Sequence, residues 1–272
     1  MSYIVVKAAT LPEAWEQAVL HCWEEGDRIR TEYDKPGDPE SRNCTAFIVV
    51  EHPFQEPRIH KAFPGSLEDL EIYRQEVVNG IHDHWVNPEE GKWSYTYHQR
   101  LFAYDLYDAQ GRKKTIDQFQ YIIEKLSSAP HSRRAQAIIW KPDVDPAVDD
   151  PACLQRIWAR ILGDELLMNV HMRSNDGFKA TFMNMWAFTA LQLYLAEQVS
   201  QRLNRTIRPG SYAHIVDSFH IYGSYFKEFE GFLKSIRMRS FAERTWNSTD
   251  EMVQSSFESA RARIAQEQRE GK

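Results

Sequence analysis

The chain contains 272 residues, which is enough for one large domain with an extensive hydrophobic core. Hydrophobic residues make up 42% and charged residues 26% of it, so the composition excludes a disordered or fibrous protein. The formal net charge of -6 argues against broad electrostatic binding of nucleic acid, and an anionic ligand would need a local group of arginines.

No membrane span and no export signal are expected. The sequence has no run of about 18 apolar residues, the length that a membrane helix needs, and residues 1–10 lack the basic start and apolar run of a signal peptide. Cys22, Cys44 and Cys153 are too few and too scattered for a disulfide framework. We therefore expect a cytoplasmic protein with reduced thiols and with neither a membrane nor a nucleic acid as partner.

The first third of the chain predicts two amphipathic helices and a strand. Apolar residues recur at helical spacing over residues 11–25, and Gly26 follows as a stop signal. Residues 27–43 are polar and contain two prolines, which predicts an exposed loop before a strand over residues 44–50. The second helix starts at Ser66 and ends near Gly80, and it carries Glu76 on or beside its apolar side.

The rest of the chain predicts a sheet with one long helix. A third helix is expected over residues 116–127, and short β-branched or aromatic runs predict strands over residues 137–140, 157–162, 166–172 and 213–222. Residues 182–203 keep one apolar side for about six turns, so they predict the central core helix. Residues 245–272 are polar and predict a solvated helix or a frayed tail. We expect one α+β domain over residues 1–272, in which the long helix packs on a large mixed sheet.

Two groups of residues are candidates for chemistry. Cys153 lies in a polar, proline-containing turn that enters a strand, where a thiol beside arginines could be a nucleophile and an apolar setting would leave it inert. Arg133, Arg134 and Arg173 are predicted near strand ends and could bind phosphate through paired donors, although surface salt bridges would also explain each one.

Histidines offer a weaker signal. His220 and Tyr222 are two residues apart in a predicted strand, so they share one face and could bind a ligand hydroxyl or form a buried pair. His82 and His84 flank Asp83, but no further ligand at a suitable spacing supports a metal, and we expect none. The motifs GxxxxGK[ST], GxGxxG, GxSxG and HExxH are missing from the sequence. The residues alone therefore support an enzyme-like domain with a candidate thiol nucleophile and an anion site.

Seven short motifs follow one another with a characteristic spacing. They are Ile116-Asp-Gln, Ser132-Arg-Arg, Trp140-Lys-Pro, Asp150-Pro-Ala-Cys-Leu-Gln, Arg173-Ser-Asn-Asp, Asn184 and His220-Ile-Tyr. In this order the chain resembles the thymidylate synthase family from about residue 66 to residue 230. Tyr95-Thr-Tyr and Cys153-Leu-Gln make it more similar to the archaeal type, and Met172-Arg-Ser-Asn-Asp is shared with phage pyrimidine hydroxymethylases.

The resemblance implies the thymidylate synthase fold and a covalent mechanism. It makes Cys153 the nucleophile that adds to C6 of a pyrimidine, so that C5 can attack the methylene group of methylenetetrahydrofolate. Glu76 matches the glutamate that organises water and moves protons around O4 and C5. Tyr97 matches a tyrosine of the active-site network, and Asp176 matches the aspartate that binds the pterin.

The resemblance also implies a homodimer with shared active sites. Arg173 and Ser174 match phosphate contacts, while Arg133 and Arg134 match phosphate-binding arginines that the other subunit donates. A further basic residue should come from residues 27–43, where Arg28, Arg30, Lys35 and Arg42 all remain candidates. The pair His220 and Tyr222 matches the contacts to the ribose hydroxyl.

Asn184 matches the position that reads the base. An amide can donate to O4 and accept from N3-H of uracil, so dUMP is expected as substrate rather than dCMP or CMP. The expected reaction is reductive methylation of dUMP to dTMP, with methylenetetrahydrofolate supplying carbon and hydride.

Two alternatives stay open. The chain ends in Arg269-Glu-Gly-Lys rather than in a short apolar tail that closes over folate, and water could then give a hydroxymethyl product. This alternative is a hydroxymethylase that acts on dUMP, dCMP or CMP. A noncatalytic nucleotide- or RNA-binding relative is the third reading, and in that case Cys153→Ala would leave the function intact.

Overall fold

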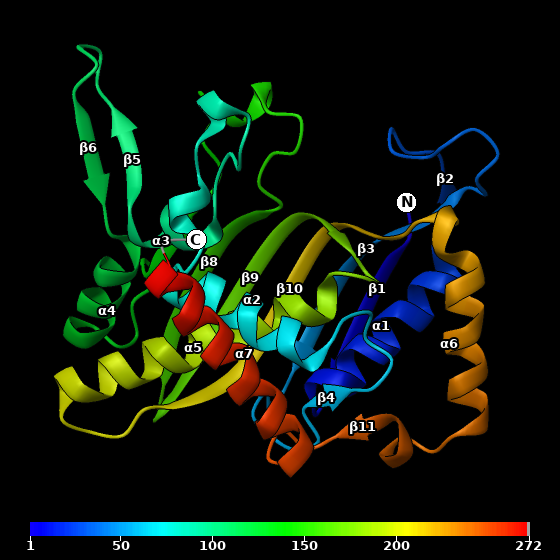
Figure 1. Ribbon diagram of the computed structural model, residues 1–272. Coiled ribbons are helices and arrows are strands. Elements are labelled where there is room, and N and C mark those ends of the chain that lie inside the picture. Colours follow the sequence, from blue (N-terminus) through cyan, green and yellow to red (C-terminus); the bar gives the residue numbers. More distant parts are fainter. Residues whose placement is uncertain (271–272) are drawn as a thin grey trace.

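A large mixed sheet forms the centre of the protein (Figure 1). The computed structural model describes residues 1–270, and within them seven strands form this sheet in the order β1-β3-β10-β9-β8-β7, with β2 also paired to β3. The bounds are β1 Tyr3–Ala8, β2 Asp27–Ile29, β3 Ser41–Val50, β7 Gln136–Ile138, β8 Leu154–Leu162, β9 Glu165–Asp176 and β10 Arg208–Ile221. The pairs β1–β3 and β9–β10 are parallel and the other pairs are antiparallel. The predicted α+β fold with a mixed sheet is confirmed.

Helices cover one face of this sheet (Figure 1). Their bounds are α1 Leu11–Glu25, α2 Leu67–Asn79, α3 Tyr97–Phe102, α4 Gln118–Ser128, α5 Thr181–Leu203, α6 Phe226–Met238 and α7 Glu251–Glu270. Two small sheets complete the fold: β4 Ile59–His60 pairs with β11 Thr245–Trp246, and β5 Tyr104–Tyr107 pairs with β6 Lys113–Ile116. No helix within residues 1–270 is both long and apolar enough to cross a membrane.

The helix α5 is the central core helix that the sequence predicts. It contacts β9 and β10 on one side and α2 on the other, and α2 in turn contacts α7 (Figure 1). Met185, Phe188, Leu191 and Leu195 on α5 are completely buried. Because apolar side chains surround α5 on several sides, this helix anchors both the sheet and the helices that bear site residues.

The helix α2 has both of the predicted boundaries. The Ser66 hydroxyl accepts a hydrogen bond from the Asp69 backbone N–H while the Asp69 carboxylate accepts one from the Ser66 N–H, which is a capping box. Gly80 ends the helix in the left-handed conformation, with a φ of 66°. A Cβ atom at Gly80 would lie only 2.2 Å from the His98 ring, so no larger residue fits there. These caps fix the register of Glu76.

Three expectations from the sequence are wrong in detail. Residues 27–43 are not wholly a loop, because Asp27–Ile29 pairs with the start of β3. The strand β9 runs on to Asp176, so Arg173 lies within the strand instead of after it. Tyr222 lies one residue beyond the end of β10. In each case the pairing between strands sets the boundary, and the local residue pattern does not carry that information.

The polar segment 245–272 is also more ordered than expected. Its helix α7 buries a narrow apolar stripe against α2, and the stripe consists of Val253, Phe257, Ala260 and Ile264. Arg261 and Arg263 on the same helix form ion pairs with Glu71 and Glu68 of α2. The helix is therefore docked rather than frayed, and only Gly271 and Lys272 of the predicted tail lie outside the described residues.

The other face of the sheet is open. Buried and exposed side chains alternate along β1, and two of the exposed ones, Tyr3 and Val5, are apolar and 71% and 73% exposed. Phe47 on β3 and Ile138 on β7 are also exposed. The strands β1 and β3 and the helix α1 lie outside the 66–230 region of resemblance, but they belong to the same sheet and core.

Candidate active site

One edge of the sheet gathers most of the predicted site residues. The parallel strands β9 and β10 end together there, and β8 begins beside the end of β9, where the Arg173 N–H donates to the Cys153 carbonyl at 2.9 Å. The helix α5 starts five residues after β9 ends. This arrangement brings together the residue before β8, the last residues of β9 and β10, and the first turn of α5.

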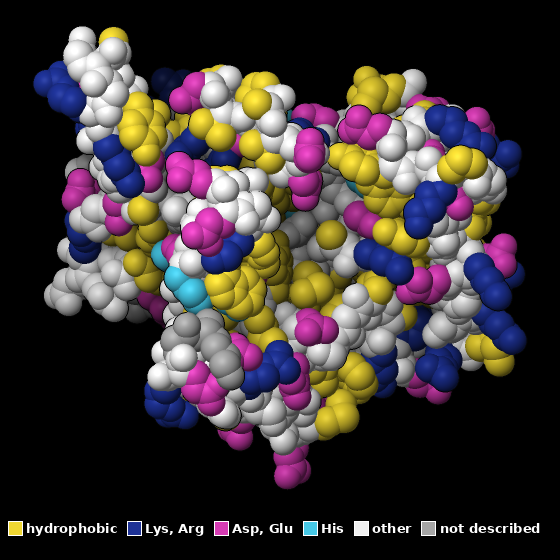
Figure 2. Space-filling model, turned by 45° about the horizontal axis from the view of Figure 1, so that its top comes forward, with side chains coloured by type: hydrophobic (Ala, Val, Ile, Leu, Met, Phe, Trp, Pro, Cys, Tyr) yellow, Lys and Arg dark blue, Asp and Glu magenta, His cyan; other side chains and the backbone are white. Residues whose placement is uncertain are grey.

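A cavity of about 390 Å³ lies at this edge. The space-filling view shows the molecule hollowed on this face, with hydrophobic side chains inside the hollow (Figure 2). Seven predicted site residues line the cavity: Tyr97, Cys153, Ser174, Asp176, Asn184, His220 and Tyr222. The volume falls in the range that small-molecule sites usually occupy.

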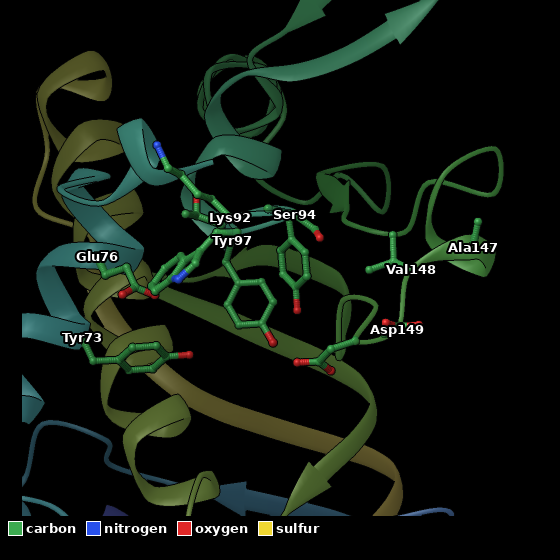
Figure 3. Close-up of a pocket in the computed structure, with 12 residues that line it drawn as sticks. Tyr73, Glu76, Lys92, Ser94, Tyr97, Ala147, Val148 and Asp149 are labelled. Carbon is green, nitrogen blue, oxygen red and sulfur yellow. The ribbon is translucent and has the colours of Figure 1, made fainter. Parts of the chain in front are cut away.

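Two further cavities share lining residues with the first. One of about 660 Å³ is lined by Tyr73, Glu76, Trp93, Tyr95 and Tyr97, and Figure 3 shows Tyr73, Glu76 and Tyr97 projecting toward the same space. The other, of about 370 Å³, is lined by Arg30, Arg173, Ser174, Ser218, His220 and Tyr222 among others, and we call it the basic cavity because its two arginines outnumber its one carboxylate, Glu32. The three cavities therefore adjoin, with Cys153 in the middle one.

Arg173 holds the Cys153 turn in place. Its guanidinium donates to the carbonyls of Pro151 at 2.5 Å and Ala152 at 3.1 Å. Just after Cys153 a register shift between Leu154 and Arg156 interrupts the pairing of β8 with β9. Burial raises the pKa of the Cys153 thiol, and the charge of Arg173 opposes this effect. The thiol is therefore held protonated next to a group that favours the thiolate.

Glu76 lies on α2 with a histidine partner. One of its carboxylate oxygens is 2.8 Å from Nδ1 of His82, and the His82 ring stacks on Trp85 with 3.7 Å between the ring centres. Burial raises the pKa of the Glu76 carboxyl, while the hydrogen bond to His82 opposes the rise. A half-buried carboxyl with a raised pKa keeps its proton to a higher pH than an exposed glutamate, which suits it to act as a proton donor and acceptor.

Asn184 is held from two sides. The Tyr73 hydroxyl donates to its Oδ1 at 2.5 Å, and its Nδ2 donates to Oδ1 of Asn175 at 3.1 Å. The sequence motifs assign no role to Tyr73 or Asn175. Neither residue has a local signal, because the contacts cross from α2 to α5 and from α5 to β9.

Asp176 and His220 form the remaining wall. Oδ1 of Asp176 accepts hydrogen bonds from the backbone N–H groups of Phe178 and Lys179 at 3.0 and 2.8 Å, but burial raises the pKa of this carboxyl. Nδ1 of His220 donates to the Ser218 carbonyl at 3.1 Å, which leaves Nε2 as an acceptor. Burial lowers the pKa of His220, so the ring is neutral. Tyr222 packs edge-on against this ring.

Comparison with known proteins identifies the family. A sequence profile described as thymidylate synthase matches residues 66–263, which is well over half of the chain. The chain belongs to the thymidylate synthase family. It is 28% identical over 233 residues to a protein of Methanococcoides burtonii, covering 86% of this chain and 96% of the relative. It is 29% identical over 224 residues to a protein of Methanocaldococcus jannaschii, covering 80% and 90%.

These archaeal relatives carry the provisional name thymidylate synthase, which agrees with the resemblance to the archaeal type. Membership of the thymidylate synthase family makes the chain an enzyme of one-carbon transfer. The family implies a nucleotide substrate such as dUMP and methylenetetrahydrofolate as co-substrate. Among residues 1–270, no group of three or more His, Cys, Asp or Glu side chains is arranged to hold a metal ion.

Two of the predicted site residues lie apart from the cavities. Arg133 and Arg134 are exposed and precede β7, and neither lines any of the three cavities. Of the four basic candidates in residues 27–43, Arg30 is the one that lines the basic cavity. Its guanidinium also donates to the Asp38 carbonyl at 2.6 Å. The sequence could not choose among these four, because the choice depends on how the segment folds over the sheet edge.

Proposed function

We propose that the protein is a thymidylate synthase, which transfers a one-carbon unit from methylenetetrahydrofolate to C5 of dUMP and reduces it to a methyl group. The observation that carries the proposal is the convergence of Cys153, Asn184 and Tyr97 on one cavity, with Glu76 on the adjoining cavity and Arg173 on the basic one. A pyrimidine nucleotide needs these features together: a nucleophile for C6, an amide for the base and cations for the phosphate.

Each side chain then has a chemical role. Cys153 loses its proton and its Sγ bonds to C6, which makes C5 nucleophilic and divides one difficult substitution into easier steps. Asn184 reads N3-H and O4 of the base. Glu76, with its raised pKa, moves protons around O4 and C5. Tyr97, whose hydroxyl accepts from the Leu154 N–H at 3.3 Å, orders the space next to the thiol.

The ends of the nucleotide find partners as well. Arg30, Arg173 and Ser174 face the phosphate from the basic cavity, where guanidinium groups can grip oxygens in pairs. His220 and Tyr222 bind the ribose hydroxyl, because Nε2 of His220 and the Tyr222 hydroxyl are polar groups on the wall between the two cavities.

The cavity of about 660 Å³ fits the folate co-substrate. Trp93, Tyr95 and Tyr97 give it aromatic walls on which a pterin can stack, and Asp176 is close by on the shared nucleotide cavity. A carboxyl with a raised pKa at this place can bind the polar edge of a pterin. Methylenetetrahydrofolate supplies the carbon and, for methylation, the hydride.

The open face of the sheet supports a homodimer. Its exposed apolar residues, among them Val5, Phe47 and Ile138, need a cover, and a second copy would supply one. Arg133 and Arg134 precede β7 at the border of this sheet, so they are proposed to reach the phosphate of the partner's nucleotide. A protein that stays strictly monomeric at micromolar concentration would contradict the shared site.

A hydroxymethylase remains the second candidate because of the position of α7. The C-terminal helix α7, which is described as far as Glu270, packs on α2 and pairs with Glu68 and Glu71. None of its described residues lines the three cavities. If water reached the methylene group carried on C5 before the hydride, the product would be a hydroxymethyl nucleotide.

The first test is product mass. The protein is incubated with methylenetetrahydrofolate and, separately, with dUMP, UMP, dCMP or CMP, with Cys153→Ala as the inactive control. The proposal expects a gain of about 14 mass units on dUMP, for methyl in place of hydrogen. A gain of about 30 units would instead establish the hydroxymethylase and name its base and sugar.

A further inference from the structure

A chain of hydrogen bonds runs from the nucleotide cavity into the core, and we call it the relay. It comprises, in order, Tyr73, Asn184, Asn175, His214 and Tyr212. Its first two bonds are those that hold Asn184. Beyond them, Nδ2 of Asn175 lies 2.9 Å from Nε2 of His214, and the Tyr212 hydroxyl lies 2.7 Å from Nδ1 of the same ring. The relay thus connects α2, α5, β9 and β10.

The orientation of the Asn184 amide decides which base it can read. Uracil presents an N3-H donor beside the O4 acceptor, whereas cytosine presents an N3 acceptor beside an amino donor. An amide has one acceptor and one donor, so turning it end over end exchanges complementarity to uracil for complementarity to cytosine. An asparagine alone therefore does not define the base. The base is defined by the residues that fix the orientation of the asparagine amide.

The inner end of the relay is completely buried, because neither His214 nor Tyr212 has any exposed surface. Asn175 is only 3% exposed, although it also lines the nucleotide cavity. Burial lowers the pKa of His214 to about 3, so its ring is neutral and carries a single proton. With Nε2 accepting from Asn175, that proton lies on Nδ1 and faces the Tyr212 hydroxyl. Each relay bond then has one donor and one acceptor.

We propose that Asn175 and His214 determine the base specificity of the site, because they fix the direction in which the Asn184 amide faces. In the observed direction, Oδ1 of Asn184 has one lone pair occupied by Tyr73, and Nδ2 has one hydrogen occupied by Asn175. The remaining lone pair and hydrogen match N3-H and O4 of uracil. Asn175 and His214 are positioning residues that act through Asn184, and the inference rests on the proposed binding of a pyrimidine nucleotide.

The relay excludes the reversed orientation of the Asn184 amide, which would bind cytosine. If His214 carried its proton on Nε2, it would donate to Asn175, and both amides would have to turn. Asn184 would then suit cytosine. The histidine tautomer in the core and the base in the cavity are therefore coupled, although no atom of His214 lines the cavity.

The test compares dissociation constants for dUMP and dCMP, measured by calorimetry on the full chain without folate. Asn175→Leu removes the fixed partner of Nδ2, so the ratio of the dCMP to the dUMP constant should fall by about tenfold. Asn175→Asp can only accept, so it holds Nδ2 of Asn184 in the observed direction and should keep the preference for dUMP. An unchanged ratio in Asn175→Leu, or a preference for dCMP in Asn175→Asp, would overturn the proposal.

Two further variants guard against a purely structural effect. Thr189→Val removes a buried hydroxyl of α5 that donates to the Trp186 carbonyl, and it should leave the ratio unchanged. Tyr73→Phe removes the donor at the outer end of the relay, and it should lower the ratio even if Asn175→Leu does not fold. Wild-type protein that binds no pyrimidine nucleotide would contradict the proposed function itself. Nucleotide binding with the same ratio in the wild type, Asn175→Leu and Tyr73→Phe would contradict only the role of the relay.

Discussion

Burial sets the protonation of the two groups that are proposed to do the chemistry. It raises the pKa of the Cys153 thiol and of the Glu76 carboxyl, and each has one neighbour, Arg173 or His82, that opposes the rise. In the free enzyme, both groups therefore keep their proton to a higher pH than an exposed cysteine or glutamate would. Such groups are suited to give up a proton when the substrate arrives.

Glu76→Gln should stabilise the protein with a characteristic pH dependence. A carboxyl whose pKa is higher in the folded than in the unfolded state makes the protein less stable as pH rises from the ordinary pKa through the raised one. The glutamine variant has no such loss. Its advantage over the wild type should be absent near pH 4 and grow to the order of 1 kcal/mol by pH 8, measured by urea unfolding. Its catalytic rate should fall.

The matched control is an exposed carboxylate with the opposite shift. The ion pair with Lys7 lowers the pKa of Glu51, so the wild type gains stability from this group as pH rises. The stability of Glu51→Gln relative to the wild type should therefore fall with rising pH, whereas that of Glu76→Gln should increase. If both variants showed the same sign, burial of Glu76 would not be the cause.

At the scale of elements, a buried ion pair ties the helix α3 to the segment that leads to Cys153. The Arg100 guanidinium grips the Asp145 carboxylate with two hydrogen bonds of 2.5 and 2.6 Å, and these side chains are 4% and 0% exposed. The Lys141 N–H donates to the same carboxylate at 2.8 Å. The pair therefore holds residues 141–148 against α3, which carries Tyr97.

Asp145→Asn should be strongly destabilising. It leaves the buried guanidinium of Arg100 without a countercharge, which costs about 3 kcal/mol in comparable pairs. Urea unfolding measures the loss, and Asp108→Asn in the exposed pair with Arg112 is the control that should not change the midpoint measurably. Equal effects of the two variants would show that the buried pair has no special importance.

Local signals predicted the elements whose ends they define. Ser66 and Gly80 delimited α2, and the long apolar side of residues 182–203 located α5. The stripe of α7 has the same kind of spacing, but it is narrow and its polar neighbours concealed it. The strand β2 has no local signal because only its pairing with β3 defines it. The strand β1 and the helix α6 were not predicted at all, although both contribute buried residues.

The site residues, like the elements, were predicted where a local signal marks them. Motif order located the residues that line the nucleotide cavity, because each occupies a fixed place relative to a strand end. The partners of those residues could not be predicted, since Tyr73, Asn175 and His214 act across contacts between distant elements. Arg30 was one of four equal candidates until the fold placed it at the basic cavity.

At the scale of the whole molecule, one sheet serves two purposes. The edge where β9 and β10 end holds the cavities, while the face opposite the helices leaves apolar side chains in the open. The proposed dimer would join these two regions, because Arg133 and Arg134 lie outside the cavities of their own chain. Stability, assembly and catalysis would then all depend on the same strands.

The central claim is that Cys153 starts chemistry at C5 of a pyrimidine nucleotide. The most direct measurement is release of tritium from dUMP labelled at C5, because methylation and hydroxymethylation both replace that hydrogen. Wild-type protein should release label in the presence of methylenetetrahydrofolate, and Cys153→Ser should release it at least about a thousandfold more slowly. Release at the wild-type rate from Cys153→Ser, or no release by the wild type from dUMP or from C5-labelled dCMP, would contradict the account.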